Sequence, residues 1–185
     1  MRVIAGTARG IPLLPPHKSL PIRPTLDRVR ESLFSILGTR IEGGRFLDLF
    51  AGTGAHGIEA LSRGAAEAVF VDGDARALKL VRDNLVKTRL ERGAVCLKLR
   101  LPAQLPALRG PFAVAFADPP YEFDDYSGLL AGLSEHHLLA EGGLFVLEHA
   151  RKNSPPEAQG ILLRTRQAHY GDTTLSFYEV SAPPL

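Results

Sequence analysis

Short apolar runs alternate along the chain with stretches whose apolar residues recur at helical spacing. Five runs predict buried strands: residues 46–50, 68–71, 94–99, 112–117 and 143–147. Three stretches predict amphipathic helices: residues 54–63, 75–88 and 126–139. Residues 161–167 and 174–180 flank Tyr170-Gly171-Asp172 and predict a closing antiparallel pair. This order predicts an α/β fold: a mostly parallel seven-stranded sheet with an antiparallel last strand and helices on both faces.

The first quarter of the chain has a different pattern. Residues 2–5 and 11–14 are short β-branched or apolar runs that can pair across the turn between Gly6 and Gly10. Pro24 and Thr25 then predict a helix start, because proline suits the first turn and threonine can cap it. We therefore divide the chain into an N-terminal extension, residues 1–43, made of a hairpin and a helix, and a core domain, residues 44–185.

Charge distinguishes the two parts. The whole chain has a net charge of +2, but residues 1–43 contain seven of the 22 basic residues and three of the 20 acidic ones. The core domain is therefore slightly acidic, and a basic extension of this kind is expected to attract phosphate groups. Arg28 lies on the polar face of the predicted helix. Arg30 lies nearer the apolar face, so two roles stay open for it: a phosphate contact or an ion pair with an acid of the core domain.

Several classes of protein are not indicated. No apolar stretch approaches the roughly 18 residues of a membrane span, and the N-terminus turns polar too early for a signal peptide, so we expect a cytoplasmic protein. The single cysteine, Cys96, excludes an internal disulfide, and no Cys/His spacing resembles a zinc site. We expect no metal. Among the histidines, His56 is expected at the surface or behind the site, and Glu148-His149 is a candidate for the rim of a pocket.

A glycine turn follows the first strand of the core domain. Asp48-Leu49-Phe50-Ala51-Gly52-Thr53-Gly54 leads into a helix, and glycines there let the backbone approach a ligand closely. Ligands of such sheets bind outside the carboxyl ends of the strands. Asp72 ends the second strand and can accept bonds from both hydroxyls of a ribose. Asp74 is expected to cap the helix that follows.

The identity of the ligand is not fixed by the glycines alone. Gly52, Gly54 and Gly57 also fit G-x-G-x-x-G, and Asp72 lies 20 residues after Gly52, the spacing of a dinucleotide site. A turn without a ligand is a further alternative. Asp48, however, lies inside the strand, where a carboxylate is costly unless it meets a polar partner such as the ammonium group of an amino-acid moiety. We therefore favour S-adenosylmethionine over a nicotinamide cofactor.

A second motif, Asp118-Pro119-Pro120-Tyr121, follows the apolar run 112–117. Two prolines end the strand and stiffen the backbone. The Asp118 carboxylate and the Pro119 carbonyl then offer two fixed acceptors, which suit one NH2 group with its two hydrogens. Tyr121 offers a flat face on which an extruded base can stack. This pattern predicts transfer of a methyl group to an exocyclic amine, achieved mainly by positioning. A proline-rich turn without function is the alternative.

These motifs resemble those of class I (Rossmann-like) amino-methyltransferases. The match extends to a longer set: Arg9-Gly10, Arg23-Pro24-Thr25, Asp27 to Glu31, Leu33-Phe34, Asp48 to Gly54, Gly57 to Ala65, Phe70-Val71, Asp118 to Tyr121 and Tyr170 to Thr173. This set resembles the RsmD family, whose members methylate N2 of a guanine in bacterial small-subunit (16S) ribosomal RNA. The family usually has Glu where this chain has Asp72. No acid occurs in the segment 99–104, where many class I enzymes recognise adenine, which leaves backbone groups or Gln104 for that contact.

The resemblance implies a SAM-dependent rRNA (guanine-N2-)-methyltransferase, most simply a monomer, acting on 16S ribosomal RNA within an assembled or assembling small subunit. The expected cofactor-binding residues are Asp48, Phe50, Ala51, Gly52, Thr53, Gly54, Asp72 and Gly73. The expected catalytic residues are Asp118, Pro119, Pro120 and Tyr121. The expected RNA-binding residues are Arg2, Arg9, Arg23, Thr25 and Arg28. The alternatives are an N6-adenine DNA or RNA methyltransferase, a protein glutamine methyltransferase, a nicotinamide oxidoreductase, or a non-catalytic ribosome-assembly factor that keeps the fold.

Overall fold

The computed structural model describes residues 1–16 and 27–181 of the chain. It contains these helices: α1 (Asp27–Leu37), α2 (Ala55–Ser62), α3 (Ala75–Thr88) and α4 (Tyr126–Glu135). Short 3-10 turns lie at Gly38–Ile41, Glu91–Gly93 and Leu105–Ala107. The strands are β1 (Arg45–Leu49), β2 (Glu67–Asp72), β3 (Ala94–Lys98), β4 (Phe112–Ala117), β5 (Leu139–Ala150), β6 (Ala158–Gln159), β7 (Leu162–Tyr170) and β8 (Thr173–Val180).

All these strands belong to one sheet in the order β3-β2-β1-β4-β5-β8-β7-β6. The first five are parallel, and β8 is antiparallel to β5. The predicted sheet with its antiparallel last strand is thus confirmed, with one addition, the two-residue strand β6 at the edge. The strand order reverses between β1 and β4, and α/β sheets bind ligands at such a switch point.

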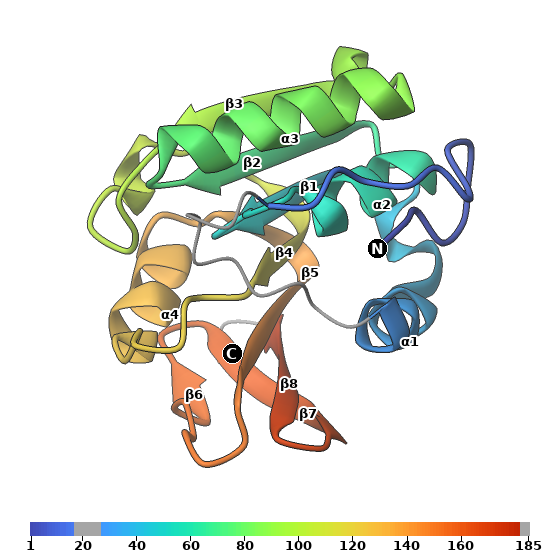
Figure 1. Ribbon diagram of the computed structural model, residues 1–185. Helices are drawn as coiled ribbons and strands as arrows, with labels where there is room; N and C mark the ends of the chain where they lie inside the picture. The colour runs from blue at the N-terminus through green and yellow to red at the C-terminus, as the bar shows by residue number, and fades with distance from the viewer. Residues whose placement is uncertain (17–26, 182–185) are drawn as a thin grey trace.

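Helices cover both faces of the sheet, as predicted (Figure 1). One apolar cluster joins the face formed by Phe46, Phe70 and Phe116 to α1, α2 and α3. A second joins the opposite face to α4, through residues such as Leu129 and Leu133. The hairpin of the N-terminal extension contributes Val3, Ala8 and Leu13 to the first cluster, so the extension and the core domain share one hydrophobic core.

The N-terminal hairpin forms as the sequence predicts. Val3 N donates to the Ile11 carbonyl (3.0 Å), Gly10 N donates to the Val3 carbonyl (2.8 Å), and Arg2 and Pro12 form an antiparallel bridge. Helix α1 begins at Asp27 and buries Val29, Leu33 and Leu37 from the predicted apolar face. The predicted helix start at Pro24 and Thr25 lies outside the described residues.

The boundary between α4 and β5 differs from the prediction. The helix ends at Glu135 and not at 139, and β5 begins at Leu139 and not at Gly143. Leu138 and Leu139 are buried, and Phe112 N donates to the Leu138 carbonyl (2.8 Å). Pairing with β4 therefore starts the strand at Leu139, and the register shift between Phe112 and Val114 accommodates the extra residues of β5.

None of the helices in residues 1–16 and 27–181 combines the length and apolarity that a membrane crossing requires.

Candidate functional site

Three aspartates meet at the carboxyl edge of the sheet. Asp48 in β1 is paired in register with Phe70 of β2 and Phe116 of β4. Because side chains in a strand alternate between faces, Asp72 and Asp118, each two residues further along, lie on the same face as Asp48 and one step closer to the edge. The sheet therefore brings together the two proposed cofactor ligands and the proposed amine acceptor at the switch point.

Asp48 lies in an environment that disfavours its charge. Its side chain is buried, and Oδ2 accepts a hydrogen bond from Gly57 N (2.9 Å) at the start of α2. Burial raises the pKa of Asp48 well above its usual value, the charges of Asp118 and Asp72 raise it further, and the Gly57 hydrogen bond opposes the shift. A positively charged ligand would offset this cost of ionisation, because it favours the ionised carboxylate.

Asp72, the other proposed cofactor ligand, holds the glycine turn. Asp72 accepts from Gly52 N (3.0 Å) through Oδ2 and from Asp74 N (2.8 Å) through Oδ1. The turn has a left-handed backbone at Phe50 (φ 57°) as well as at Gly52 and Gly54. A non-glycine residue in that region is uncommon and is often found in functional loops. The carboxylate thus fixes the turn and keeps lone pairs with which it can accept further hydrogen bonds.

Gly57 allows α2 to lie unusually close to the sheet. A Cβ atom at this position would come within 2.3 Å of Cε1 of Phe70 in β2. Only glycine fits there without displacing the ring, so the helix start remains directly behind the turn. The turn residues Ala51, Thr53 and Gly54 are buried, Phe50 and Gly52 partly so, and Gly73 is exposed beside Asp72.

The Asp118-Pro119-Pro120-Tyr121 segment begins where β4 ends. Asp118 and Pro119 are half-buried, whereas the Tyr121 side chain is exposed, at 65 %. Phe123 N donates to the Pro120 carbonyl (2.9 Å), which closes the turn after the prolines. The Phe123 ring packs edge-on against Phe50, at 5.2 Å between centroids, so the turn after the two prolines contacts the glycine turn directly.

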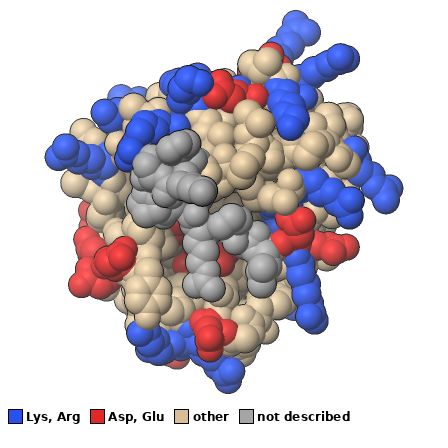
Figure 2. Space-filling model, viewed as in Figure 1, with Lys and Arg blue, Asp and Glu red and all other residues tan. Residues whose placement is uncertain are grey.

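The structure places three of the five proposed RNA-binding residues on the surface. Arg2, Arg9 and Arg28 are exposed, whereas Arg23 and Thr25 lie outside the described residues. On the face drawn in Figure 2, Lys and Arg side chains lie around the rim and are not gathered in one patch. On this face, positive charge is therefore available from several elements besides the extension.

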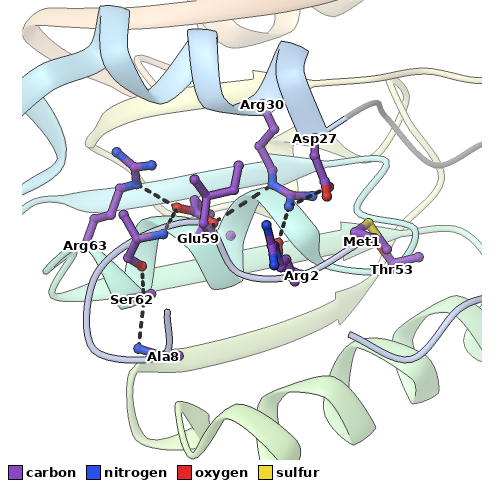
Figure 3. Close-up of polar contacts among 12 residues, drawn as sticks. Met1, Arg2, Ala8, Asp27, Arg30, Thr53, Glu59, Ser62 and Arg63 are labelled. Carbon is purple, nitrogen blue, oxygen red and sulfur yellow. Dashed lines mark hydrogen bonds and ion pairs between the residues drawn. The ribbon is translucent and has the colours of Figure 1, made fainter. Parts of the chain in front are cut away.

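Of the two roles that the sequence left open for Arg30, the structure shows the second, an ion pair with an acid of the core domain. It is fully buried, and its guanidinium lies 3.1 Å from the Asp27 carboxylate and 3.9 Å from that of Glu59 in α2 (Figure 3). It also donates to the Arg2 carbonyl. Burial lowers the pKa of Arg30, and the two acids oppose that shift. Arg30 thus joins α1, the hairpin and the core domain.

Glu59 is a residue that the sequence did not single out. It is completely buried and accepts from Ile4 N (2.8 Å), Ala5 N (3.0 Å) and Arg63 Nε (2.7 Å). Ser62, one turn further along α2, donates to the Ala5 carbonyl (2.5 Å) and accepts from Ala8 N (2.9 Å). The polar face of α2 therefore binds the backbone of the hairpin.

Asn84 is a second residue that sequence reasoning missed. It is buried in α3, where Oδ1 accepts from Leu14 N (2.7 Å) and Nδ2 donates to the Thr53 carbonyl (3.0 Å). The Thr53 hydroxyl also contacts the Met1 sulfur (3.8 Å). A signal was present, because Asn84 interrupts the apolar stripe formed by Leu78, Val81 and Leu85. Asn84 ties the glycine turn to the extension.

The remaining candidates have structural positions. His56 is buried and stacks on Phe116 at 3.9 Å between centroids, and burial lowers its pKa to about 3, so it is neutral near pH 7. Asp74 caps α3, as predicted, by accepting from Arg76 N (2.8 Å). Gln104 accepts from Arg100 N (2.6 Å) and so shapes the loop after β3. Within residues 1–16 and 27–181, no group of three His, Cys, Asp or Glu side chains is placed to hold a metal.

Comparisons with known proteins show one family and relatives named as rRNA methyltransferases. Residues 1–179 match the family model described as Conserved hypothetical protein 95. The chain is 40% identical over 182 residues to "Putative rRNA methyltransferase YlbH" of Bacillus subtilis (strain 168), covering 97% of this chain and 98% of the relative. It is 31% identical over 182 residues to Ribosomal RNA small subunit methyltransferase D of Escherichia coli (strain K12), covering 98% and 91%. The solved structure of a hypothetical protein from Thermus thermophilus has a TM-score of 0.80 at 36% identity, covering 98% and 99%.

Proposed function

The chain belongs to the family described as Conserved hypothetical protein 95, the RsmD family that its sequence resembles, and from this premise we propose that it is a SAM-dependent rRNA (guanine-N2-)-methyltransferase. The proposed substrate is the exocyclic N2 amine of a guanine in small-subunit (16S) ribosomal RNA. The observation that carries the proposal is the meeting of Asp48, Asp72 and Asp118 on one face of the sheet at the switch point. Relatives named as rRNA methyltransferases support the substrate class.

The cofactor side of the site matches a cationic amino-acid nucleoside. Asp48, whose pKa is raised by burial and by two neighbouring carboxylates, would bind the methionine ammonium group. Asp72, which already accepts from Gly52 N, would accept from the ribose hydroxyls. The glycine turn, residues 50–54, would allow the protein backbone to approach the cofactor closely. When bound, S-adenosylmethionine supplies an electrophilic methyl group on a sulfonium sulfur.

The amine side is formed by the segment after β4. The Asp118 carboxylate and the Pro119 carbonyl would accept the two hydrogens of the NH2 group, which directs the nitrogen lone pair toward the methyl group. Methyl transfer from the bound cofactor to this nitrogen would leave S-adenosylhomocysteine, and the nitrogen would give up one proton. Asp118, or water, would accept that proton. Tyr121, exposed next to the prolines, would hold the extruded base by stacking.

The deciding experiment is mass mapping of methylated nucleosides in 16S ribosomal RNA from cells with and without this protein. The proposal expects one N2-methylguanosine to disappear when the protein is missing and to return with the wild-type chain. An N6-methyladenosine that disappears would indicate the adenine alternative. If no methylated nucleoside changes, the non-catalytic assembly factor would be the remaining alternative.

Variants test the roles of the individual residues. Asp118→Ala should reduce turnover by about 100-fold or more, the scale of a positioning loss, and leave S-adenosylhomocysteine affinity nearly unchanged. Tyr121→Ala should weaken capture of the base by about 1–3 kcal/mol, the value of one stacking contact. Methylation by Asp118→Ala at the wild-type rate would exclude the proposed amine acceptors.

A further inference from the structure

The loop between β5 and β6 brings a lysine to the proposed base-stacking residue. Lys152 and Tyr121 are exposed and lie 31 positions apart in the sequence, and the Lys152 Nζ atom is 4.9 Å from the centroid of the Tyr121 ring. A cation at this distance is attracted to the face of an aromatic ring. Because a ring has two faces, this placement leaves the other face of Tyr121 for a base.

Backbone hydrogen bonds hold this loop in place. Arg151 N donates to the Asp172 carbonyl in the turn between β7 and β8 (2.7 Å), and Asn153 N donates to the Ala150 carbonyl (2.9 Å). Lys152 therefore lies between two residues whose backbone is fixed. Its position beside Tyr121 follows from the end of β5 and the turn before β8.

A buried histidine supports the same loop. His149 Nδ1 lies 2.9 Å from the Ala150 carbonyl oxygen, which can only accept, so Nδ1 carries the proton. His149 Nε2 then accepts from the Ser176 hydroxyl (2.8 Å), and Gln167 donates to that hydroxyl oxygen (3.0 Å). Burial lowers the pKa of His149, which is consistent with a neutral ring. The sequence suggested Glu148-His149 for the rim of a pocket. In the structure, His149 supports the loop that carries Lys152.

We propose that Lys152 is a substrate-binding residue that contacts a backbone phosphate of the RNA at the nucleotide whose base stacks on Tyr121. The inference rests on the proposed function, and it adds an RNA contact from the C-terminal part of the chain to those proposed for the arginines of the extension. A lysine is a compact charge on a flexible stem, which suits a phosphate whose exact position changes as a base is extruded. Hydrogen bonding to Tyr121 raises the pKa of Lys152, so its positive charge is retained.

The test compares three variants for binding to small ribosomal subunits whose 16S ribosomal RNA is unmodified, taken from cells that lack this protein, over a range of salt concentrations. Lys152→Gln removes the charge, and Lys152→Arg keeps it. Lys87→Gln is the matched control, because Lys87 is an exposed lysine in the last turn of α3, at the end remote from the carboxyl edge of the sheet.

Lys152→Gln should lower the log–log salt slope by about 0.7, the value for one single-strand phosphate contact, which corresponds to an increase in Kd of about fourfold near 0.15 M salt. Lys152→Arg should restore most of the affinity, and Lys87→Gln should match the wild type. S-adenosylhomocysteine affinity should not change in any of the three.

Methyl transfer to the same RNA, measured in parallel, separates this inference from the proposed function. A wild type that transfers no methyl group, combined with a lowered slope for Lys152→Gln, would refute the proposed function and keep the phosphate contact. A Lys152→Gln variant with the wild-type Kd and slope overturns the contact, whether or not the wild type methylates the RNA.

Discussion

Removing the Glu59 carboxylate should be among the most damaging single changes outside the catalytic groups. This side chain is 0 % exposed and accepts from Ile4 N, Ala5 N and Arg63 Nε, with the buried Arg30 guanidinium 3.9 Å away. Glu59→Ala leaves Arg30 in the interior without this partner. Breaking a buried ion pair in this way costs about 3–5 kcal/mol.

The Glu59→Ala variant should still fold, with a lower free energy of unfolding. Domains are typically stable by about 5–15 kcal/mol, so a loss of about 3–5 kcal/mol takes a large part of the free energy of unfolding. The bonds that Glu59→Ala removes hold the hairpin to α2, so the hairpin amides should exchange hydrogen faster in this variant. Residues 1–5 should be affected first, because Ile4 and Ala5 no longer have their acceptor.

Glu67 supplies a matched control. It also pairs with an arginine, Arg45, at 2.7 Å, but both side chains are about one-third exposed. Exposed ion pairs are worth about 0–1 kcal/mol. Urea denaturation should therefore show a much smaller loss for Glu67→Ala than for Glu59→Ala. Equal losses in the two variants would refute the idea that a buried polar network fixes the hairpin to the core domain.

Three further predictions concern the ligands. Asp72→Ala should weaken S-adenosylhomocysteine binding by roughly 1.5–3 kcal/mol, the value of bonds to a charged group, and unchanged affinity by calorimetry would remove Asp72 from the cofactor site. The pKa of Asp48 is raised, and its ionised form is the one that binds an ammonium group, so cofactor affinity should increase as the pH rises through that pKa. Asp48→Asn should abolish this pH dependence. If the variant keeps the pH dependence, another group causes it. Neutralising Arg9, Arg23 and Arg28 together should raise the RNA Kd and reduce its salt slope by up to about 0.7 for each phosphate that is no longer bound, while a wild-type slope would mean that the extension does not bind RNA.

Features that depend on neighbouring residues were predictable from the sequence. The glycine turn was predicted because positive φ angles favour glycine, although Phe50 shares that conformation. Helix α3 spans the predicted residues 75–88, and Asp74 caps it, because periodicity and capping are local properties. Strand β4 spans the predicted residues 112–117, and the pattern of alternating strands and helices was sufficient for the α/β class.

The motifs in the sequence also pointed to three residues that the structure brings to one edge of the sheet. Asp48, Asp72 and Asp118 were each assigned from their own motif, and parallel strands bring their carboxyl ends to one edge. The start of β5 was not predictable, because Leu138 and Leu139 follow an amphipathic helix directly. Only pairing with Phe112 decides that the strand begins at Leu139.

The tertiary structure alone decided which polar side chains hold the extension and the loop after β5. Glu59 and Asn84 accept from backbone N–H groups 55 and 70 positions away, and Lys152 reaches a ring 31 positions away. Every residue except proline has a backbone N–H. The amino-acid sequence therefore does not show which backbone N–H will bond to a buried carboxylate or amide. Local pattern therefore determined the elements and the motifs of this protein, and long-range packing determined the contacts between them.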